Sequence, residues 1–352
     1  MLTTLSTEDL IPAEHPIRKI RVVVDTILAE LDPVFDRMYA TGGRSSVPPE
    51  ALLKATVLMA MYSIRSERAF CERLNYDLLF KWFLDMRIDQ PAFDPTTFTK
   101  NRKRLLEHAV ADEFFAAVVR QAKLRKYISS DHFSVDGTLL KAWASHKSFK
   151  PKDGPPSEPP AGRSAEEQWH GEKRSNGTHA STTDPESRLY RKRNNTAATL
   201  CFSGHLLMEH RNALIVDAEL DFADGYAERA TALAMLAKLP RSARRLTVAG
   251  DKNYDTQDFV AQAGQLGFTP HVAQNESKHR RSAIDGRTTR HEGHVVSIRI
   301  RKRIEEPFGW MKTVGGGRQL RYKGRERNWA WFKLTAAVYN LIRITALDTP
   351  TA

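Results

Sequence analysis

The chain has 352 residues, of which 41% are hydrophobic and 9% aromatic, enough to build apolar cores for two or three domains. Lys and Arg number 54 against 42 Asp and Glu, so the formal net charge is +12 and the pI is about 9.7. A protein this basic commonly meets a polyanion, most often nucleic acid. Two cysteines, Cys71 and Cys201, are too few for a disulfide framework or a zinc ribbon.

The sequence predicts neither a membrane segment nor a secretion signal. The longest apolar run, residues 52–62, contains Lys54 and is shorter than the ~20 residues that span a bilayer. Glu8, Asp9 and Glu14 occupy the stretch where a signal peptide would be basic and then apolar. We therefore expect a reducing, cytoplasmic location without membrane contact.

Residues 1–126 are predicted to be all-α, because apolar residues recur there at helical spacing. One helix is expected to follow Asp94-Pro95, and it carries four basic residues: Lys100, Arg102, Lys103 and Arg104. We interpret these four as DNA contacts, and the alternative is an ordinary solvated helix face. The region shows no catalytic constellation, so we expect it to bind DNA or to serve in assembly.

The pattern changes from helix to strand after residue 126. Phe133 and Val135 alternate with polar residues, which predicts a strand that carries Asp136 on its other face. Residues 147–188 are rich in Lys, Pro, Gly, Ser and Glu and poor in apolar residues. This composition predicts a flexible insertion, because such a segment buries too little apolar surface to offset its ordering entropy.

Strands and helices then alternate to the end of the chain. Strands are predicted at 197–210, 213–220, 245–250 and 269–273, and helices at 228–239, 255–264, 297–313 and 329–346. This order predicts a mixed α/β sheet with helices over residues 127–346, preceded by a separate helical domain over residues 1–126.

Two aspartates mark the expected sheet as a site. Asp136 lies inside a strand, where Asp is uncommon, and Asp251 follows directly after the strand predicted at 245–250. The carboxyl end of such a strand is where α/β sheets place functional groups. The alternatives are an edge-strand Asp for the first and a turn or helix-capping Asp for the second.

A third carboxylate, Glu305, belongs to a more specific pattern. On an α-helix of ~100° per residue, Arg301, Glu305 and Lys312 lie within ~40° of one another, beside an apolar stripe. The alternative is an exposed salt-bridge face. Pro307 also argues against one uninterrupted helix, because proline removes a backbone hydrogen bond.

Asp136, Asp251 and Glu305 together suit phosphoryl transfer by two metal ions. Such ions lie ~4 Å apart and share carboxylate oxygens, one ion serving the nucleophile and the other the leaving oxygen. Mg²⁺ prefers oxygen ligands and accepts some of them from a substrate phosphate.

The run Arg301-Lys-Arg-Ile-Glu305-Glu-Pro-Phe-Gly-Trp-Met-Lys312 resembles the Tyr-x2-Arg-x3-Glu-x6-Lys signature of a large group of bacterial insertion-sequence DDE transposases. Ile298 stands at the tyrosine position. Val135-Asp-Gly-Thr138 is similar to the first-Asp strand of that group. Gly250-Asp-Lys-Asn-Tyr-Asp255 is similar to its second-Asp motif, with Asn253 where glycine is usual.

This resemblance extends over nearly the whole chain and implies an RNase H-like catalytic core. It implies Asp136, Asp251 and Glu305 as metal ligands, Mg²⁺ as cofactor with Mn²⁺ as a substitute, and Arg301 and Lys312 as phosphate contacts. The implied substrates are the terminal inverted repeats of an insertion sequence and a double-stranded target. The protein is then expected to form a homodimer on DNA and to associate with the bacterial nucleoid.

Two other functions fit part of the pattern. One is an RNase H-like nuclease or a domesticated DNA-binding protein without strand transfer. The other is a helix-turn-helix regulator that uses only the N-terminal region. The carboxylate triad disfavours the regulator, because a protein that only binds DNA needs no such residues.

Overall fold

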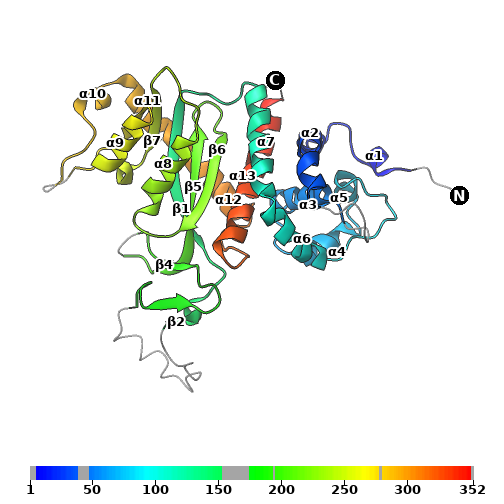
Figure 1. Ribbon diagram of the computed structural model, residues 1–352. Coiled ribbons are helices and arrows are strands. Elements are labelled where there is room, and N and C mark those ends of the chain that lie inside the picture. The colour runs from blue at the N-terminus through cyan, green and yellow to red at the C-terminus, as the bar shows by residue number, and fades with distance from the viewer. Residues whose placement is uncertain (1–4, 39–46, 153–173, 193–194, 277–279, 350–352) are drawn as a thin grey trace.

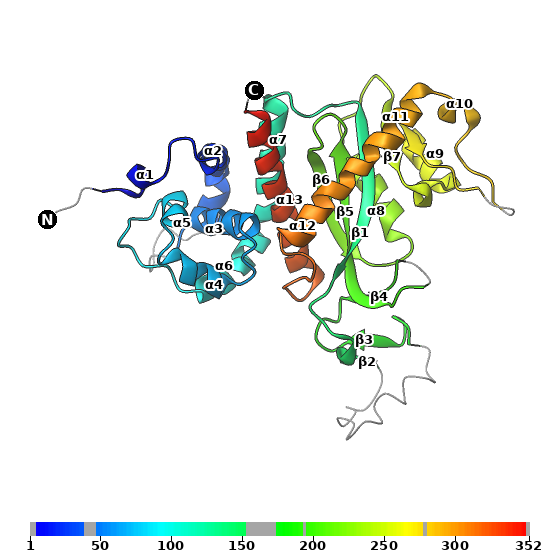
Figure 2. The same cartoon turned by 180° about the vertical axis from the view of Figure 1, so that it is seen from behind.

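The computed structural model describes residues 5–38, 47–152, 174–192, 195–276 and 280–349. Figures 1 and 2 show small helices near the N-terminus, a central layer with two long helices, and a twisted sheet with further helices beyond it. No helix of these ranges is both long enough and apolar enough to cross a membrane.

The N-terminal part is helical, as its periodicity predicts. Ser66 and Asp77 each cap a helix by accepting a hydrogen bond from the backbone N–H three residues ahead, which satisfies a donor that the helix cannot. The helices are α1 (Thr7–Leu10), α2 (Ile17–Asp36), α3 (Pro49–Met61), α4 (Glu67–Leu74), α5 (Leu78–Phe83), α6 (Thr96–Glu107) and α7 (Val110–Leu124).

Helix α7 belongs structurally to the sheet as much as to the other N-terminal helices. It packs along α13 (Arg325–Leu347), and α13 packs on the sheet. One apolar core therefore joins the N-terminal helices to the sheet, and Phe114 and Leu206 are both part of it. The two regions expected to be separate share this core, because the stripe of α7 is buried by a helix from the other end of the chain.

The main sheet has the order β6-β5-β1-β7-β8, and β4 pairs with the first residues of β5. Only β5 runs opposite to the other four of this order. Numbered along the chain, β1, β5, β6, β7 and β8 are strands 1 to 5 of this sheet. Their order across the sheet is therefore 3-2-1-4-5, which confirms the RNase H-like fold. The strands are β1 (His132–Lys141), β4 (Arg188–Tyr190), β5 (Thr199–Glu209), β6 (Ile215–Phe222), β7 (Leu246–Gly250) and β8 (Phe268–Val272).

Helices α8 (Ala227–Ala237) and α9 (Gln257–Gln265) cover the face of the sheet opposite α13. A second apolar core forms there and includes Phe133, Val135 and Phe259. After β8 the chain continues through α10 (Gly286–Thr289), α11 (Glu292–Ile300), the 3₁₀ segment η5 (Arg301–Ile304) and α12 (Glu305–Thr313). Segment η5 packs against β1 and so brings the end of the chain to the first strand.

The expected insertion at 147–188 is partly regular, which its composition does not predict. Strand β2 (Phe149–Pro151) pairs with β3 (His179–Ser181), and β4 joins the main sheet. Hydrogen bonds in addition to apolar burial hold these ends, for example Ser148 Oγ to Ser181 Oγ at 2.7 Å. The central part of the expected insertion, 153–173, lies outside the described residues.

Candidate active site

The two candidate aspartates lie on neighbouring strands. Strands β1 and β7 are parallel, and their pairing ends at Ser134 opposite Ala249. Two residues further along each strand come Asp136 and Asp251, where the strands are no longer paired. The sheet thus places both residues at the open edge of β1 beyond the end of β7, near enough for their charges to interact.

Burial at this edge changes the chemistry of Asp136. Its Oδ1 accepts a hydrogen bond of 2.8 Å from the Gly137 N–H. Burial raises the pKa of Asp136 to about 6, and the charge of Asp251 adds to the rise. The Gly137 N–H, Lys192 and Arg301 act in the opposite direction without cancelling the shift. Asp136 is therefore a carboxyl whose negative charge the fold compensates only in part.

Asp251 has two roles in the structure. Its Oδ1 accepts a hydrogen bond of 2.7 Å from the Asn253 N–H, so it caps the short 3₁₀ helix η4 (Lys252–Tyr254). The capping role that we set beside the catalytic one is therefore real. Its charge also acts on Asp136, so the capping hydrogen bond and an interaction with Asp136 coexist in one residue.

A third acid lies beside these aspartates, and the sequence patterns did not single it out. Glu228 is in the first turn of α8. Burial and the charges of Asp251 and Asp136 together raise its pKa to about 7, against the opposing effects of Lys192 and the Gly137 N–H. We call Asp136, Glu228 and Asp251 the carboxylate cluster. The one sequence signal is Gly137, because a glycine inside a strand often marks a close approach by another group.

Arg301 and Lys312 both reach the neighbourhood of Asp136. Lys312 donates a hydrogen bond of 2.6 Å to Thr138 Oγ1, two residues after Asp136 on the same strand face. Burial lowers the pKa of Lys312, Lys192 lowers it further, and Asp136 opposes the shift. The Arg301 Nε is buried without a hydrogen-bond partner among the described residues. Neither cation forms an ion pair with an acid among the described residues.

Glu305 is not among the groups that most strongly affect the pKa values of Asp136 and Glu228. It is exposed at the start of α12, directly after η5. An ideal 3₁₀ segment turns ~120° per residue instead of ~100°, so the ~40° expected between Arg301 and Glu305 on an unbroken α-helix does not carry over to η5. Its neighbour Glu306 faces α13, where its Oε1 is 3.3 Å from the Tyr339 hydroxyl and 3.4 Å from Arg343. Of the two neighbours, Glu305 is the one not engaged in packing.

The cluster suits a hard divalent cation by its donor type, since every side chain in it offers carboxylate oxygens. Within the described ranges, no group of three or more His, Cys, Asp or Glu side chains stands in an arrangement that could already hold a metal ion. Carboxylates with little compensation repel one another, so a more open arrangement is expected without a cation. By donor type the residues present fit Mg²⁺ or Mn²⁺, and by their present spacing they do not yet form a complete ligand set.

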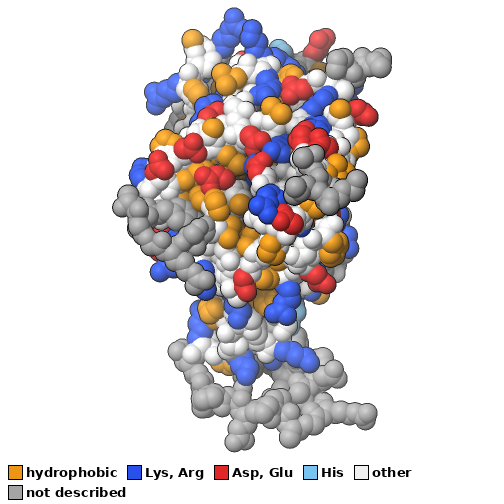
Figure 3. All heavy atoms as spheres, turned by 90° about the vertical axis from the view of Figure 1, so that its right-hand side faces the viewer, with side chains coloured by type: hydrophobic (Ala, Val, Ile, Leu, Met, Phe, Trp, Pro, Cys, Tyr) orange, Lys and Arg blue, Asp and Glu red, His pale blue; other side chains and the backbone are white. Residues whose placement is uncertain are grey.

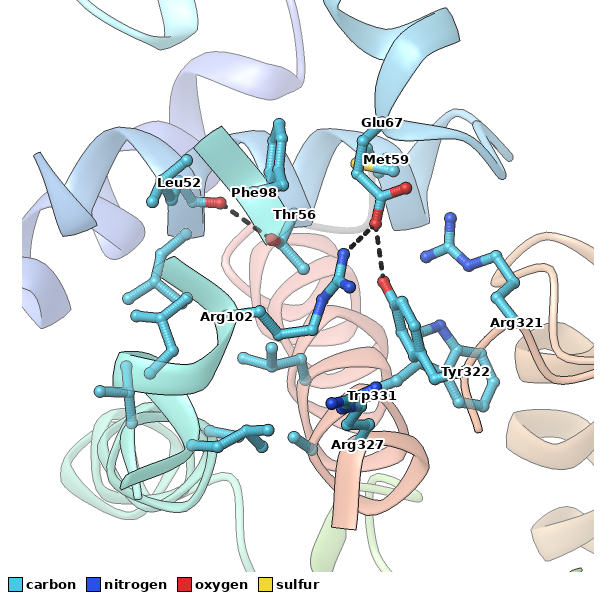
Figure 4. A pocket seen from close by; sticks show the side chains of 17 residues that line it. Leu52, Thr56, Met59, Glu67, Phe98, Arg102, Arg321, Tyr322, Arg327 and Trp331 are labelled. Atoms are coloured by element: carbon cyan, nitrogen blue, oxygen red, sulfur yellow. Dashed lines mark hydrogen bonds and ion pairs between the residues drawn. The ribbon is translucent and has the colours of Figure 1, made fainter. Parts of the chain in front are cut away.

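The four basic residues expected to contact DNA do not share one environment. Lys100 is exposed, and Lys103 is 83% exposed with Glu107 at 3.4 Å. Arg104 is also exposed. Arg102 instead points inward, as Figure 4 shows.

Arg102 pairs with Glu67, which also accepts a hydrogen bond of 3.1 Å from the Tyr322 hydroxyl (Figure 4). Its guanidinium lies 4.4 Å from the centre of the Tyr322 ring. These residues line a cavity of about 70 Å³ between the N-terminal helices and α13. Arg102 therefore holds the helices together, a role that differs from the exposed contact that we expected.

The surface on the side of the N-terminal helices is not uniformly basic. Figure 3 shows acidic and basic side chains mixed around an apolar area on its broad upper part. Lys and Arg predominate at the narrow lower end, around β2 and β3, where Lys150 and Lys152 are exposed. The basic character of the chain is thus concentrated away from α6 on this face.

Two family models match the chain. Residues 5–104 match a transposase domain (DUF772), and residues 129–341 match a transposase DDE domain. No curated protein matches significantly.

Solved structures resemble the chain only distantly. A piggyBac transposase synaptic complex with hairpin DNA has a TM-score of 0.43 at 8% identity, over 97% of this chain and 78% of the other. A pre-cleavage Mos1 transpososome has a TM-score of 0.21 at 9% identity, over 89% and 84%. The assignment rests on the family models, of which the second alone covers more than half of the chain. The chain belongs to the DDE transposase family, whose members are enzymes that cut and join DNA.

Proposed function

We propose that this transposase binds the terminal inverted repeats of an insertion sequence, cleaves the DNA ends and joins the 3′ ends to target DNA. The observation that carries the proposal is the meeting of Asp136 and Asp251 where β1 and β7 end their pairing. Two carboxylates at one sheet edge favour binding of cations and of a phosphate carried with them.

The proposed ligands of Mg²⁺, or of Mn²⁺ in its place, are Asp136, Asp251 and Glu305. When bound, two such ions would activate an attacking oxygen and stabilise a leaving one. Glu305 is exposed and outside the cluster, so it joins the aspartates when DNA and cations assemble the site. The chain's own part is to hold the aspartates on a rigid sheet and to exclude water from Asp136.

Arg301 and Lys312 are proposed to hold the phosphate that reacts. Lys312 is anchored through Thr138, and Arg301 has a buried Nε without a partner among the described residues. A planar guanidinium can bind phosphate through two hydrogen bonds, which lysine cannot copy. Lys100, Lys103 and Arg104 of α6 are proposed to contact DNA further from the reaction, and Arg102 to support them from inside. The proposed active form is a homodimer on DNA.

The test is a cleavage and joining assay with the inverted repeats that flank the gene. We expect the full-length protein to cut these ends in Mg²⁺ or Mn²⁺ and to join the 3′ ends to a plasmid target. Cleavage without joining would favour the alternative, an RNase H-like nuclease. Specific binding without cleavage would favour a domesticated DNA-binding protein.

A further inference from the structure

We propose that Glu228 is a fourth carboxylate of the active site, which helps Asp136 and Asp251 to hold a divalent cation before DNA arrives. The inference rests on the proposed function, since it assigns a further ligand to the same site. Neither the signature around Glu305 nor the two aspartate motifs contains Glu228.

The first observation is the space that β1 leaves for this side chain. A Cβ atom at position 137 would lie 3.1 Å from Glu228 Oε1 and 3.2 Å from its Cγ. These distances are tighter than most real Cβ contacts, so Glu228 approaches the strand where residue 137 has no side chain. The carboxylate thus touches the residue that directly follows Asp136.

The second observation is a set of buried polar groups around Glu228 that lack partners. His205 is opposite Gly137 on β5, is 0% exposed, and has no hydrogen bond to either ring nitrogen within the described ranges. Its Nδ1 lies 3.1 Å from the same Cβ position at residue 137 as Glu228 Oε1. Unpaired buried polar atoms are costly, so their presence indicates that something is still to be bound here.

Tyr254 gives the same indication from the other side. It is 1% exposed, and its hydroxyl lies toward Glu228 without a hydrogen bond of normal geometry to any described residue. Burial raises the pKa of Tyr254 well above its usual value, and Glu228, Asp136 and Asp251 raise it further. The Tyr254 ring packs against Gly250, the residue before Asp251, where an added Cβ atom would lie 2.8 Å from the ring.

An ordinary role for Glu228 would be to stabilise the N-terminus of α8, where an acid in the first turn interacts well with the helix dipole. Asp258 has that position in α9, and it is exposed. Glu228 is instead half-buried against a strand that carries another acid, so like charges oppose it. A helix-capping role does not need this placement, whereas a shared cation would remove the repulsion. Asp258 is therefore a matched control.

The experiment measures Mn²⁺ binding to the full chain without DNA, by the loss of the free Mn²⁺ electron paramagnetic resonance signal. We expect the wild type and Asp258→Asn to bind alike, and Asp136→Asn to lose binding. Glu228→Gln should weaken the affinity at least about tenfold, the loss typical of disturbed metal sites. Glu228→Asp should recover part of it, because the charge is kept and only the reach is shortened.

Gly137→Ala provides a second variant that leaves all carboxylates in the chain. It should weaken Mn²⁺ binding by displacing Glu228. For every variant, the rise in Tm that Mn²⁺ produces should follow the affinity, because a ligand of the folded state stabilises it. This readout also shows whether each variant is folded.

The outcomes separate the inference from the proposed function. Wild-type Mn²⁺ affinity in both Glu228→Gln and Gly137→Ala, with binding lost in Asp136→Asn, would overturn the role of Glu228 alone. Wild-type affinity in Asp136→Asn and Asp251→Asn would overturn the proposed metal site itself.

Discussion

Helix α8 has a charged cluster at each end, and the two clusters differ in how their acids are paired. Glu228 of the carboxylate cluster lies in the first turn of α8. At the other end of the helix, Lys238 pairs with acids of β6. The second group contains Lys333, Lys238, Asp112, Asp217 and Glu219, and we call it the lysine network.

In the lysine network every acid lies in contact with a cation. Lys333 is 2% exposed, and its Nζ lies 2.8 Å from Asp217, 3.2 Å from Glu219 and 3.1 Å from Asp112. Burial alone would raise the pKa of Asp217, but Lys333 and Lys238 hold it below its usual value. These acids are charged partners of a buried cation, and no further ligand is required.

The carboxylate cluster shows the reverse. Burial raises the pKa of Asp136 to about 6 and that of Glu228 to about 7, and the cations Lys192 and Arg301 do not cancel the rise at Asp136. The lysine network thus holds its acids in contact with cations, whereas the cations near Asp136 leave its pKa raised. Perturbed acids of this kind gather at functional sites, although structural networks also perturb pKa values.

The largest expected effect is the loss of catalysis when an acid of the carboxylate cluster is replaced. Asp136→Asn or Asp251→Asn should reduce strand cleavage and joining at least about a thousandfold, as when one member of a cooperating catalytic set is lost. Binding of the DNA ends should persist or strengthen, because repulsion toward phosphate falls. Gel shift and cleavage are measured on the same samples at one salt concentration.

Asp217→Asn is the matched control, an acid-to-amide change in the lysine network. Its cleavage rate per folded molecule should stay within a fewfold of the wild type. Equal cleavage by Asp136→Asn and the wild type would remove the distinction between the clusters. Glu305→Gln and Glu306→Gln form a second matched pair, in which only the first should lose cleavage.

The next effect concerns stability. Lys333→Met should lower the free energy of unfolding by about 3–5 kcal/mol, because it leaves buried acids without their cation. Lys238→Met should cost about 1 kcal/mol or less, because this lysine side chain is 55% exposed. Urea denaturation measures both. Similar losses in the two variants would show that burial does not govern the network.

The third effect is the pH dependence of stability without divalent cations. Raised pKa values mean that the folded state binds protons more tightly than the unfolded state. The free energy of unfolding should therefore fall as pH rises from about 4 through about 7. For Glu228 the loss approaches about 3 kcal/mol by pH 8, at 1.36 kcal/mol per unit.

Glu228→Gln should therefore stabilise the chain above pH 7 in the presence of a chelator. Asp217→Asn should do the opposite, because the folded pKa of Asp217 is depressed and its stabilisation is present at neutral pH. Urea denaturation at pH 5 and pH 8 tests both signs. If the Glu228→Gln variant is less stable than the wild type at pH 8, charge repulsion within the carboxylate cluster is not what raises the pKa of Glu228.

The sequence could predict the parts of the site that lie on single elements. Asp136 and Asp251 follow from strand patterns, and the chain topology then brings them together. Glu228 could not be found this way, because its approach to Gly137 depends on how α8 packs on β1. The hydrophobic periodicity within one segment carries no information on how closely a helix packs on a strand.

The same limit explains the two other differences. The expected angle between Arg301 and Glu305 assumed an unbroken α-helix, and the 3₁₀ segment η5 changes it. The sequence predicts Arg102 to be one of four basic residues that contact DNA. In the structure it points inward, because it pairs with Glu67 and stacks on the Tyr322 ring, and both residues come from distant parts of the chain. The hydrophobic periodicity of a sequence predicts which face of a helix or strand is apolar. Whether a basic side chain on the other face is exposed depends on residues from distant parts of the chain.

A smaller effect is expected at the cations that surround the carboxylate cluster. Lys312→Ala removes a cation from beside Asp136, so binding of the DNA ends should weaken about tenfold and cleavage should fall in step. Binding of Mn²⁺ to the free protein should not weaken. Cleavage that falls while end binding is unchanged would assign Lys312 to the reaction step instead of to the phosphate.

The smallest effect is expected at α6, and it tests whether exposure separates DNA contacts from structural cations. Lys100 and Lys103 are exposed, so replacing both with Gln should leave stability nearly unchanged. If each binds a phosphate, the slope of log affinity against log salt should flatten by about one unit per residue, equally for all DNA sequences. Arg102→Gln should instead lower the free energy of unfolding, because Glu67 loses its partner and the Tyr322 ring its stacked guanidinium. Salt titrations of DNA binding, paired with urea denaturation, distinguish the two. An unchanged slope in the double variant would make the face of α6 an ordinary solvated surface and move the search for DNA contacts to the basic end around β2 and β3.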